Sequence, residues 1–199
     1  MNSWLLTAGF LLLGYLSGSL PFSVWVTKVV IGKDVRDGGS GHATTTNTIR
    51  QAGYAAGVIV LVMDMLKGFL PTFLAVKYAP YSWVPPLVAG LTVVGHCWPL
   101  FAGFRGGMGL AVAGASLLGV QWSYALIGFG LLLVLNFTIK HSARAAFFAG
   151  ILIAPLMLLV GAGKTLVWAS LAVGIVIALR FLSEWNRKYQ EKWLDGNWQ

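Results

Sequence analysis

Two segments of this sequence concentrate the residue types that bind oxyanions. The first motif, GSGHATTTNTIR at residues 39–50, combines glycines, hydroxyls, an amide and Arg50 in a short stretch. Hydroxyl and backbone N–H groups donate to anionic oxygens, and a guanidinium adds a planar fork with a permanent charge. This set of residues suits a phosphate group. A solvated polar loop explains the same composition equally well on the residues alone.

The second motif, GHCWPLFAGFRGGMG at residues 95–109, attaches a basic, glycine-rich loop to the end of an apolar stretch. Glycine tolerates positive φ and lets its N–H groups approach a ligand beside a cation such as Arg105. The pattern favours oxyanion binding, and a helix-breaking loop between two membrane spans is the alternative. His96 is a candidate general base, with a helix-end histidine bonded to a backbone carbonyl as the structural alternative.

The composition places both motifs in a membrane protein. Of the 199 residues, 57% are hydrophobic and 10% are charged, and the mean hydropathy is +0.76. A soluble fold of this length cannot bury so many apolar side chains. We therefore predict an all-α, polytopic membrane protein that forms one domain over residues 1–199. Cys97 is the single cysteine, and no metal-ligand cluster is visible in the sequence, so we predict no metal and no cofactor.

Seven apolar blocks predict about seven transmembrane helices. Several are shorter than the roughly 20 residues that cross about 30 Å of hydrocarbon. The fourth is the weakest, so a six-span or re-entrant arrangement stays open. Residues 1–20 lack the basic start and cleavage site of a secretory signal, and we expect them to remain as part of the first span. The blocks cover residues 4–30, 53–76, 84–101, 110–120, 124–139, 145–160 and 166–182.

The basic residues predict the orientation, because short loops rich in lysine and arginine stay in the cytoplasm. One set of alternate loops carries only Lys77 and Lys164. The other set carries Lys28, Lys33, Arg36, Arg50, Arg105, Lys140, Arg144, Arg180, Arg187, Lys188 and Lys192. We therefore predict an outside N-terminus, a cytoplasmic C-terminus, and both motifs on the cytoplasmic face. The cations are scattered between apolar blocks, which argues against nucleic acid and favours anionic lipid and phosphorylated substrates.

Asp64 and Lys67 lie three residues apart in the second apolar block, on one face of the predicted helix. Isolated charges are costly in lipid, so we expect the two side chains to pair or to face the bundle interior. A functional site is one reading of such intramembrane charges. A structural pair that ties helices together is the other.

Four segments in this order resemble the acyl-phosphate glycerol-3-phosphate acyltransferases of bacteria, the PlsY type. They are GSLPF at residues 18–22, the first motif, DMLKG at residues 64–68 and the second motif. The family's loops read G-S-G-N-x-G-A-T-N-x-x-R and G-H-x-x-P-x-F-x-x-F-x-G-G-K-G. The resemblance implies a seven-helix enzyme of the bacterial inner membrane. It implies transfer of a fatty acyl group from acyl phosphate to glycerol 3-phosphate, which gives lysophosphatidic acid for phospholipid synthesis.

The resemblance also implies which residues form the site. It assigns catalysis to Ser40, Arg50 and His96. It assigns binding of the substrate phosphates to Asn47, Thr46, Arg105, Gly106, Gly107 and Gly109. The implied partners are acyl phosphate, glycerol 3-phosphate and membrane lipid, without nucleic acid. The sequence leaves the oligomeric state open.

The chain departs from the family pattern at positions that matter for charge. Met108 replaces the loop lysine, whose compact ammonium belongs to the family's phosphate site. His42 replaces an asparagine and is a candidate replacement donor, while Phe181 and Glu184 stand where the family's tail run H-R-E-N has histidine and asparagine. The alternative function is a catalytically inactive or re-specialised paralog that binds lipid precursors or a membrane partner. A transporter is disfavoured because no inverted repeat is visible.

Overall fold

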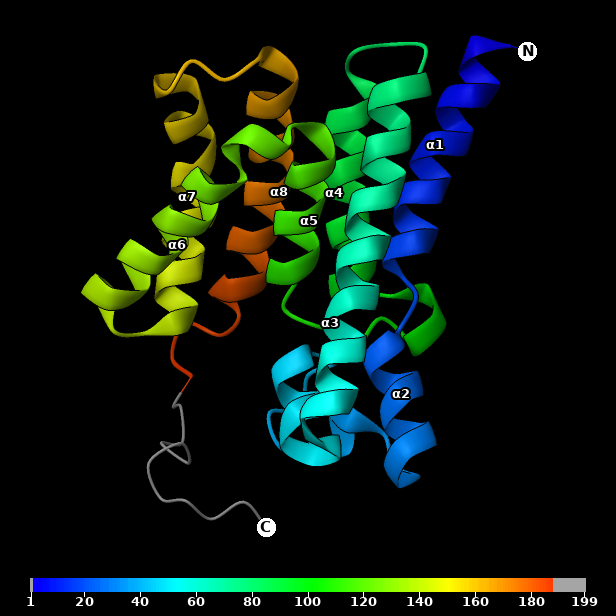
Figure 1. The fold of residues 1–199 in the computed structure, drawn as a ribbon, viewed down its shortest axis with the longest axis vertical. Helices are drawn as coiled ribbons and strands as arrows, with labels where there is room; N and C mark the ends of the chain where they lie inside the picture. The colour runs from blue at the N-terminus through cyan, green and yellow to red at the C-terminus, as the bar shows by residue number, and fades with distance from the viewer. Residues whose placement is uncertain (1, 188–199) are drawn as a thin grey trace.

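The structure, a computed structural model, describes residues 2–187, and every regular element in that range is a helix. The α-helices are α1 (Ser3–Gly18), α2 (Phe22–Ile31), α3 (Thr45–Tyr78), α4 (Val84–Cys97), α5 (Leu110–Val120), α6 (Ala125–Ile139), α7 (Ser142–Leu159) and α8 (Lys164–Leu182). Three short 3-10 helices, η1 (Val35–Asp37), η2 (Leu100–Ala102) and η3 (Trp122–Tyr124), lie in the connections. Figure 1 shows the long helices side by side, with α2 at one end of the bundle. The all-α prediction is confirmed.

Within the described residues, 6 helical segments are long and apolar enough to cross a membrane. They are Ser3–Ile31, Thr45–Tyr78, Val84–Ala102, Trp122–Ile139, Ser142–Leu159 and Lys164–Leu182. The remaining apolar helix, α5, corresponds to the fourth predicted block. Its 11 residues span only about 17 Å, so the weakest predicted span is too short to cross the hydrocarbon core by itself.

The first predicted span is two helices rather than one. α1 ends at Gly18 and α2 begins at Phe22, with residues 19–21 outside both helices. Pro21 lacks an N–H donor and its ring disfavours helical geometry for the residue before it, so the helix cannot continue through this point. The break turns α2 away from α1 toward the end of the molecule that carries the first motif (Figure 1).

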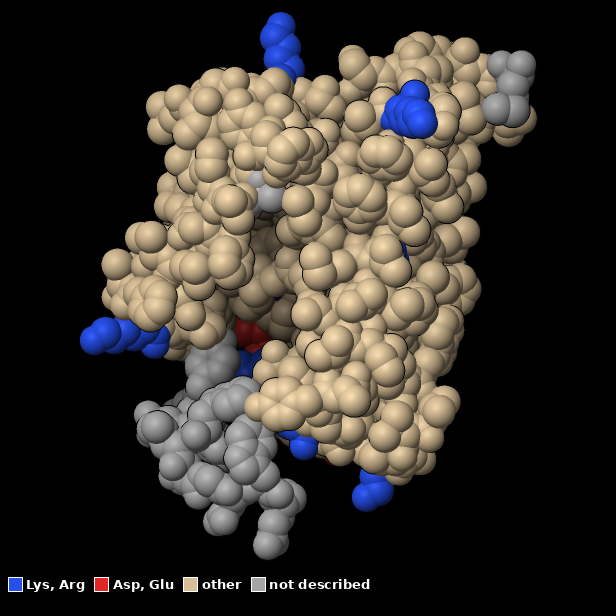
Figure 2. Space-filling model, in the orientation of Figure 1, with Lys and Arg blue, Asp and Glu red and all other residues tan. Residues whose placement is uncertain are grey.

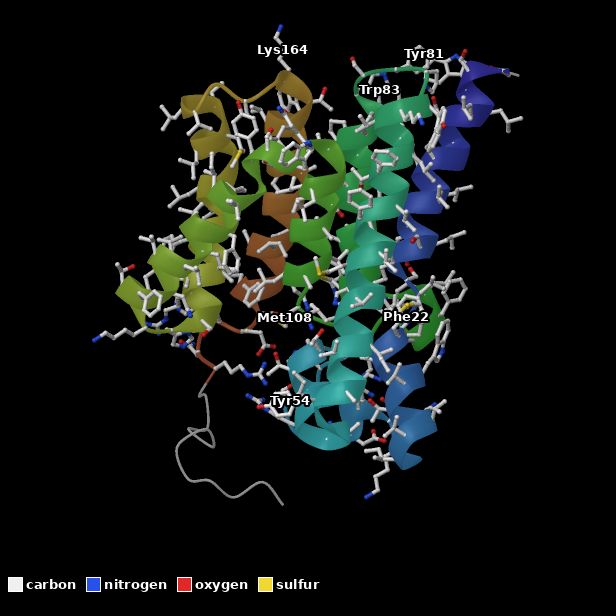
Figure 3. All side chains as sticks on the ribbon, viewed as in Figure 1. Phe22, Tyr54, Tyr81, Trp83, Met108 and Lys164 are labelled. Atoms are coloured by element: carbon white, nitrogen blue, oxygen red, sulfur yellow. The ribbon has the colours of Figure 1, made fainter. Side chains whose placement is uncertain are left out.

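The two ends of the bundle differ in the loops that they carry. The short connections between α3 and α4 and between α7 and α8 lie at the end marked by Tyr81, Trp83 and Lys164 in Figure 3. The connections of residues 32–44, 98–109 and 140–141 lie toward the opposite end (Figure 1). The loops predicted to share a face therefore do so, while the assignment of that face to the cytoplasm remains a prediction. Lys188 and Lys192 lie outside the described residues.

A break inside α3 separates the first motif from the membrane part of the helix. Gly53 has φ 86° and ψ 170°, values that no helical residue adopts. The segment before it carries the end of the first motif, and the segment after it carries Asp64 and Lys67. Thr44 caps the helix by accepting the Asn47 N–H at 3.2 Å, which fixes the start of the short segment.

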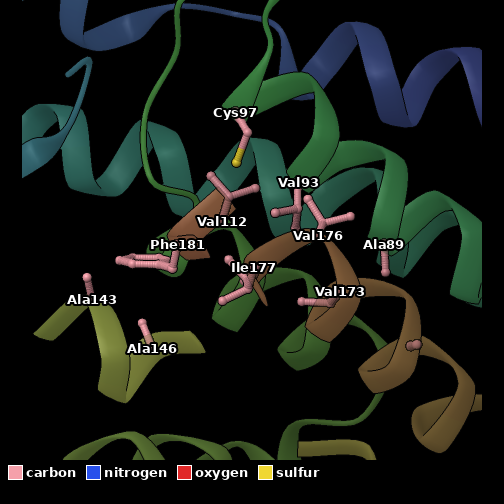
Figure 4. Packing of buried hydrophobic residues seen from close by; sticks show 12 residues of the cluster. Ala89, Val93, Cys97, Val112, Ala143, Ala146, Val173, Val176, Ile177 and Phe181 are labelled. Atoms are coloured by element: carbon pink, nitrogen blue, oxygen red, sulfur yellow. The ribbon is translucent and has the colours of Figure 1, made fainter. Parts of the chain in front are cut away.

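Small apolar side chains fill the centre of the bundle, where α4, α5, α7 and α8 meet (Figure 4). Alanine and valine predominate, and α7 approaches α8 so closely at Gly150 and Gly174 that a Cβ on Gly150 would lie 2.6 Å from the Gly174 carbonyl oxygen. Membrane helices pack through such small residues because lipid offers no hydrophobic driving force between them. The end of α8 is thereby held beside the loop that precedes α5.

Candidate active site

Asn47 organises the first motif from inside the loop. Its side chain is fully buried, and its amide oxygen accepts the Ser40 N–H at 3.0 Å. The amide nitrogen donates to three carbonyl groups, those of Val35, Gly38 and His42, at 2.7, 3.1 and 3.0 Å. The geometry therefore gives Asn47 a positioning task, while its contact with phosphate stays a prediction. It fixes the backbone of the loop and with it the position of Ser40.

The turn of the first motif wraps so closely around Asn47 that residue 39 has to be glycine. Gly39 has φ +58°, and a Cβ at this position would collide with Asn47 Oδ1. Gln51, one turn further along α3, supports the same loop by donating to the carbonyls of Val35 and Gly38 at 2.6 and 3.2 Å. Sequence reasoning did not identify Gln51, because nothing in its type or spacing distinguishes it from a surface glutamine.

The second motif docks on the first through its backbone. The Gly107 N–H donates to the His96 carbonyl at 3.1 Å, and the Ala43 N–H donates to the Gly106 carbonyl at 3.4 Å. A Cβ on Gly107 would lie 2.5 Å from the Ala43 carbonyl oxygen and would collide with the His96 ring, so only glycine allows this approach. The Gly107 N–H, which was predicted to donate to phosphate, points into the protein instead.

Arg36, in η1 just before the first motif, connects that segment to the second motif. Its Nη1 donates to the carbonyls of Ala102 and Arg105 at 2.7 and 3.1 Å, while Asp34 holds the other side of the guanidinium at 2.8 Å. The hydrogen bonds from Arg36 keep the pKa of Asp34 below its ordinary value. From the sequence, Arg36 was expected only to add a positive charge to its loop.

The remaining predicted ligands lie around this junction with different exposure. Thr46, Arg50 and Arg105 have exposed side chains, and Ser40 is half-buried. Gly109 is buried with φ +86° and directly precedes α5 as its N-cap. The structure thus brings the two motifs together, with the arginine side chains at the surface and the glycines inside.

The turn after α8 closes over the first motif through two residues that depart from the family pattern. His42 Nε2 lies 3.1 Å from Glu184 Oε1, and Arg187 pairs with the other oxygen of Glu184 at 2.9 Å. Arg187 also donates to the Ser40 carbonyl at 3.0 Å. Burial lowers the pKa of His42, the charge of Glu184 opposes that effect, and Arg180 and Arg187 lower it further. Two substitutions that are distant in sequence therefore contact each other.

Arg180, in the last turn of α8, binds the second motif directly. Its Nε donates to the Gly107 carbonyl at 2.9 Å. The next residue, Met108, packs against the apolar core cluster. Figure 3 labels it near the junction of α5, α8 and the first motif. The loop position that lacks a lysine thus has an arginine from α8 beside it, and from the sequence Arg180 was expected only as one more cation of the cytoplasmic loops.

A buried ion pair lies beneath the second motif. Asp64 Oδ1 and Lys67 Nζ are 2.8 Å apart, with 3% and 4% of their side chains exposed. Lys67 also donates to the Leu20 carbonyl at 2.7 Å, at the break between α1 and α2. His96 Nδ1 lies 3.7 Å from Asp64 Oδ1, and the other face of the His96 ring backs Gly107. The expectation that Asp64 and Lys67 pair inside the bundle is confirmed.

An apolar cavity of about 530 Å³ adjoins the motifs. Side chains of α3, α5, α6, α7 and α8 line it, and it extends from Leu110 and Ile177 beside the second motif to Gln121 and Leu166 at its far end. Figure 2 shows a hollow between the two halves of the molecule, with acidic and basic atoms at its lower end. The hydroxyl of Ser170 faces this cavity, is fully buried and has no hydrogen-bond partner within residues 2–187. The space suits a long apolar chain whose head reaches the motifs.

No group of three or more His, Cys, Asp or Glu side chains that could hold a metal ion occurs within residues 2–187.

Comparison with known proteins gives consistent matches. A family described as glycerol-3-phosphate acyltransferase matches residues 8–191. The chain is 41% identical over 127 residues to "Glycerol-3-phosphate acyltransferase 2" of Thermotoga maritima, which covers 64% of this chain and 63% of the relative. It is 48% identical over 114 residues to a glycerol-3-phosphate acyltransferase of Geobacillus kaustophilus, covering 57% of each chain. The aligned part thus spans less than two thirds of these curated relatives.

Two solved structures match over nearly the whole fold. Both are of PlsY (YgiH), an integral membrane glycerol 3-phosphate acyltransferase. The glycerol 3-phosphate form gives a TM-score of 0.79 at 32% identity, covering 91% of this chain and 90% of that chain. The lysophosphatidic acid form gives 0.75 at 30% identity, with the same coverage.

Proposed function

Because this chain belongs to the glycerol-3-phosphate acyltransferase family, we propose that it transfers a fatty acyl group from acyl phosphate to glycerol 3-phosphate. The product is lysophosphatidic acid, for phospholipid synthesis. The observation that carries the proposal is the contact between the two motifs together with an apolar cavity that begins at Leu110, directly after the second motif. A polar substrate and a fatty chain have to meet at such a boundary for this reaction.

The cavity and the motifs suit the two parts of an acyl phosphate. The fatty chain occupies the space between α5 and α8, where burial of each CH₂ contributes about 0.8 kcal/mol. The phosphate then lies at the second motif, because Leu110 and Ile177 line the cavity beside Gly109. Arg50 and Arg105 have exposed side chains in the two motifs and attract the phosphates from solution.

The reaction needs no nucleophile from the protein. The primary hydroxyl oxygen of glycerol 3-phosphate attacks the acyl carbonyl carbon and forms the ester bond. The bond from that carbon to the bridging phosphate oxygen breaks, and phosphate leaves with the electron pair. A phosphate oxygen accepts the hydroxyl proton. The protein contributes alignment and stabilisation of the developing negative charge.

Within this proposal, we assign different tasks to the predicted residues. Ser40 and Arg50 contact the substrates, and Thr46, Arg105, Gly106 and Gly109 support the phosphates. His96 is buried behind Gly107 with Asp64 on its other side, so we assign it to positioning the second motif instead of to proton transfer. Asn47 and Gly107 hold the two loops in place through the internal hydrogen bonds described above.

The relatives are bacterial, and the many cations at one end of the bundle favour a cytoplasmic location for that end. We therefore propose that the chain resides in the bacterial inner membrane with both motifs facing the cytoplasm, where glycerol 3-phosphate is soluble. Labelling of the variants Thr46→Cys and Tyr81→Cys in intact cells tests this orientation, because the two residues lie at opposite ends of the bundle.

One observation favours the second candidate, a paralog that binds lipid precursors without turnover. Met108 packs against the core and provides no charge at the position of the family's lysine. Both candidate functions require the phosphate subsite. They differ because only the acyltransferase turns its substrates over.

The deciding experiment measures phosphate release from a synthetic acyl phosphate and glycerol 3-phosphate by the purified protein in lipid, with lysophosphatidic acid identified by mass spectrometry. We expect activity in the wild type and in Lys33→Ala, an exposed cation of the same face, and loss of activity in Arg50→Ala. Activity that appears only in Met108→Lys would favour the paralog. Activity that Arg50→Ala leaves unchanged would refute the assignment of Arg50.

A further inference from the structure

We propose that Arg180 binds the phosphate of the acyl donor and supplies, from α8, the positive charge that Met108 does not provide. This inference rests on the proposed function, and it adds the residue and the substrate that meet at the site. It follows from the contacts of Arg180, from the absence of a carboxylate partner within residues 2–187, and from its position three residues after Ile177, which lines the cavity.

Arg180 is held against the second motif by a single strong contact. Its Nε donates to the Gly107 carbonyl at 2.9 Å, and its Nη1 is 3.5 Å from the Ser183 hydroxyl, at the limit of a hydrogen bond. A guanidinium has five N–H donors. The other donors of this half-buried side chain have no partner within residues 2–187. The side chain is thus fixed in place with donors to spare, which suits the binding of an anion.

The charge of Arg180 also lacks a counterion in the part of the chain that the structure describes. Glu184, the acidic residue nearest in sequence, pairs with His42 and Arg187. Asp34 pairs with Arg36, and Asp64 pairs with Lys67. A half-buried cation without a carboxylate partner is stabilised when an anionic ligand arrives.

Arg180 lies where a phosphate head would be placed by a chain in the cavity. Ile177 lines the cavity and is three residues before Arg180, so both are on one face of α8. Ile177 also lies beside Gly109, where a Cβ would be 3.2 Å from Ile177 Cδ1. A ligand with its fatty chain along Ile177 therefore has its head beside Arg180 and Gly107. Glycerol 3-phosphate, which has no such chain, is not directed there by the cavity.

Electrostatics place Arg180 within reach of the first motif as well. Its charge contributes to lowering the pKa of His42, after the larger effect of burial and against the effect of Glu184. Arg187, which faces His42 from the same turn, donates to the Ser40 carbonyl. The positive potential of Arg180 thus extends to the junction of both motifs, where the acyl phosphate and the acceptor have to meet.

The test compares Arg180→Gln, Arg180→Lys and the double variant Met108→Lys/Arg180→Gln with the wild type, and Lys33→Gln serves as the control. We expect Arg180→Gln to raise the KM for acyl phosphate about tenfold or more, with the KM for glycerol 3-phosphate nearly unchanged. We expect Arg180→Lys to raise the KM for acyl phosphate less than Arg180→Gln does. In Met108→Lys/Arg180→Gln we expect the KM to return toward the wild-type value. A residue that only tethers Gly107 would give no rescue, because a lysine at position 108 does not replace the bond to the Gly107 carbonyl.

A binding measurement separates this inference from the proposed function. Dodecyl phosphate, dodecanol and glycerol 3-phosphate are added separately, and the melting temperature of each variant is recorded in detergent. We expect dodecyl phosphate to stabilise the wild type more than dodecanol does, and Arg180→Gln to abolish the difference while melting as a folded protein. This result in a protein without acyltransferase activity would support the inference and refute the proposed function. Equal stabilisation of the wild type and Arg180→Gln by dodecyl phosphate would overturn the inference.

Discussion

Removal of Lys67 is expected to destabilise the bundle more than any single surface substitution. Lys67→Met leaves Asp64 buried, with 3% of its side chain exposed and without the ammonium 2.8 Å away. Breaking one partner of a buried pair costs about 3–5 kcal/mol, because the remaining charge has no water to solvate it. The only other cationic candidate near Asp64 in the described residues is His96, whose Nδ1 is 3.7 Å away, beyond hydrogen-bond distance.

The reverse substitution is expected to cost less. In Asp64→Asn the ammonium of Lys67 keeps its hydrogen bond to the Leu20 carbonyl at 2.7 Å and its position 5.5 Å from the centre of the Phe22 ring. A hydrogen bond to a charged group contributes about 1.5–3 kcal/mol, so the loss in Asp64→Asn should be smaller by roughly that amount. The double variant Asp64→Leu/Lys67→Met removes both charges, and its stability should lie near that of the wild type.

The assay is reversible unfolding of the purified protein in mixed micelles by titration with a denaturing detergent, followed by tryptophan fluorescence. Lys77→Met, at the exposed end of the same helix, is the control and should change the free energy of unfolding by less than about 0.5 kcal/mol. Equal losses in Lys67→Met and Lys77→Met would refute the reasoning. A loss in Asp64→Leu/Lys67→Met as large as the loss in Lys67→Met would refute it as well, since removal of both charges leaves no unpaired charge in the bundle.

Three further predictions concern the motifs and the cavity. The pKa of His42 lies below its ordinary value of 6.5 in the folded state, so the folded state binds fewer protons than the unfolded state in acid. Stability should therefore fall as the pH drops below 6.5. Thermal melting at a series of pH values checks this, and the melting temperature of His42→Asn should depend less on acid. Gly107→Ala places a Cβ 2.5 Å from the Ala43 carbonyl oxygen and should abolish phosphate release, whereas Gly9→Ala, with no atom within 4 Å of its Cβ, should keep it. Ser170→Leu removes a hydroxyl that has no hydrogen-bond partner in the described residues, and it fills part of the cavity. The melting temperature should stay the same or rise. Activity should shift toward shorter acyl chains, as measured with acyl phosphates of increasing length.

Much of the fold was predictable because hydropathy is a local property. The apolar blocks coincide with helices, and the weak fourth block proved to be the short α5. The break at residues 19–21 was missed because the apolar block continues through Pro21, and only the geometry of that one residue ends the helix. The position of the polar loops at one end of the bundle was predictable from charge alone, because the prediction does not depend on which loops contact each other.

The site was predictable in its motifs but not in the tasks of single residues. Gly107 suggested close approach to a ligand, yet the group that approaches it is the His96 ring, and at Gly39 it is the Asn47 side chain. Type and spacing show that Asn47 has donors, but they do not show that three carbonyls already use them. The bond from Arg187 to Ser40 joins residues 147 positions apart, a distance over which no sequence period carries information.

The way in which the cations are held explains why the site keeps a positive charge. A carbonyl group that accepts a hydrogen bond from a guanidinium fixes its position without cancelling its charge, whereas a carboxylate does both. Arg36, Lys67 and Arg187 each donate to a carbonyl and also pair with a carboxylate. Within residues 2–187, Arg180 has the carbonyl without the carboxylate. Under the proposed role of Arg180, its net charge is left for a ligand, and α8 supplies the cation that the loop lacks at position 108.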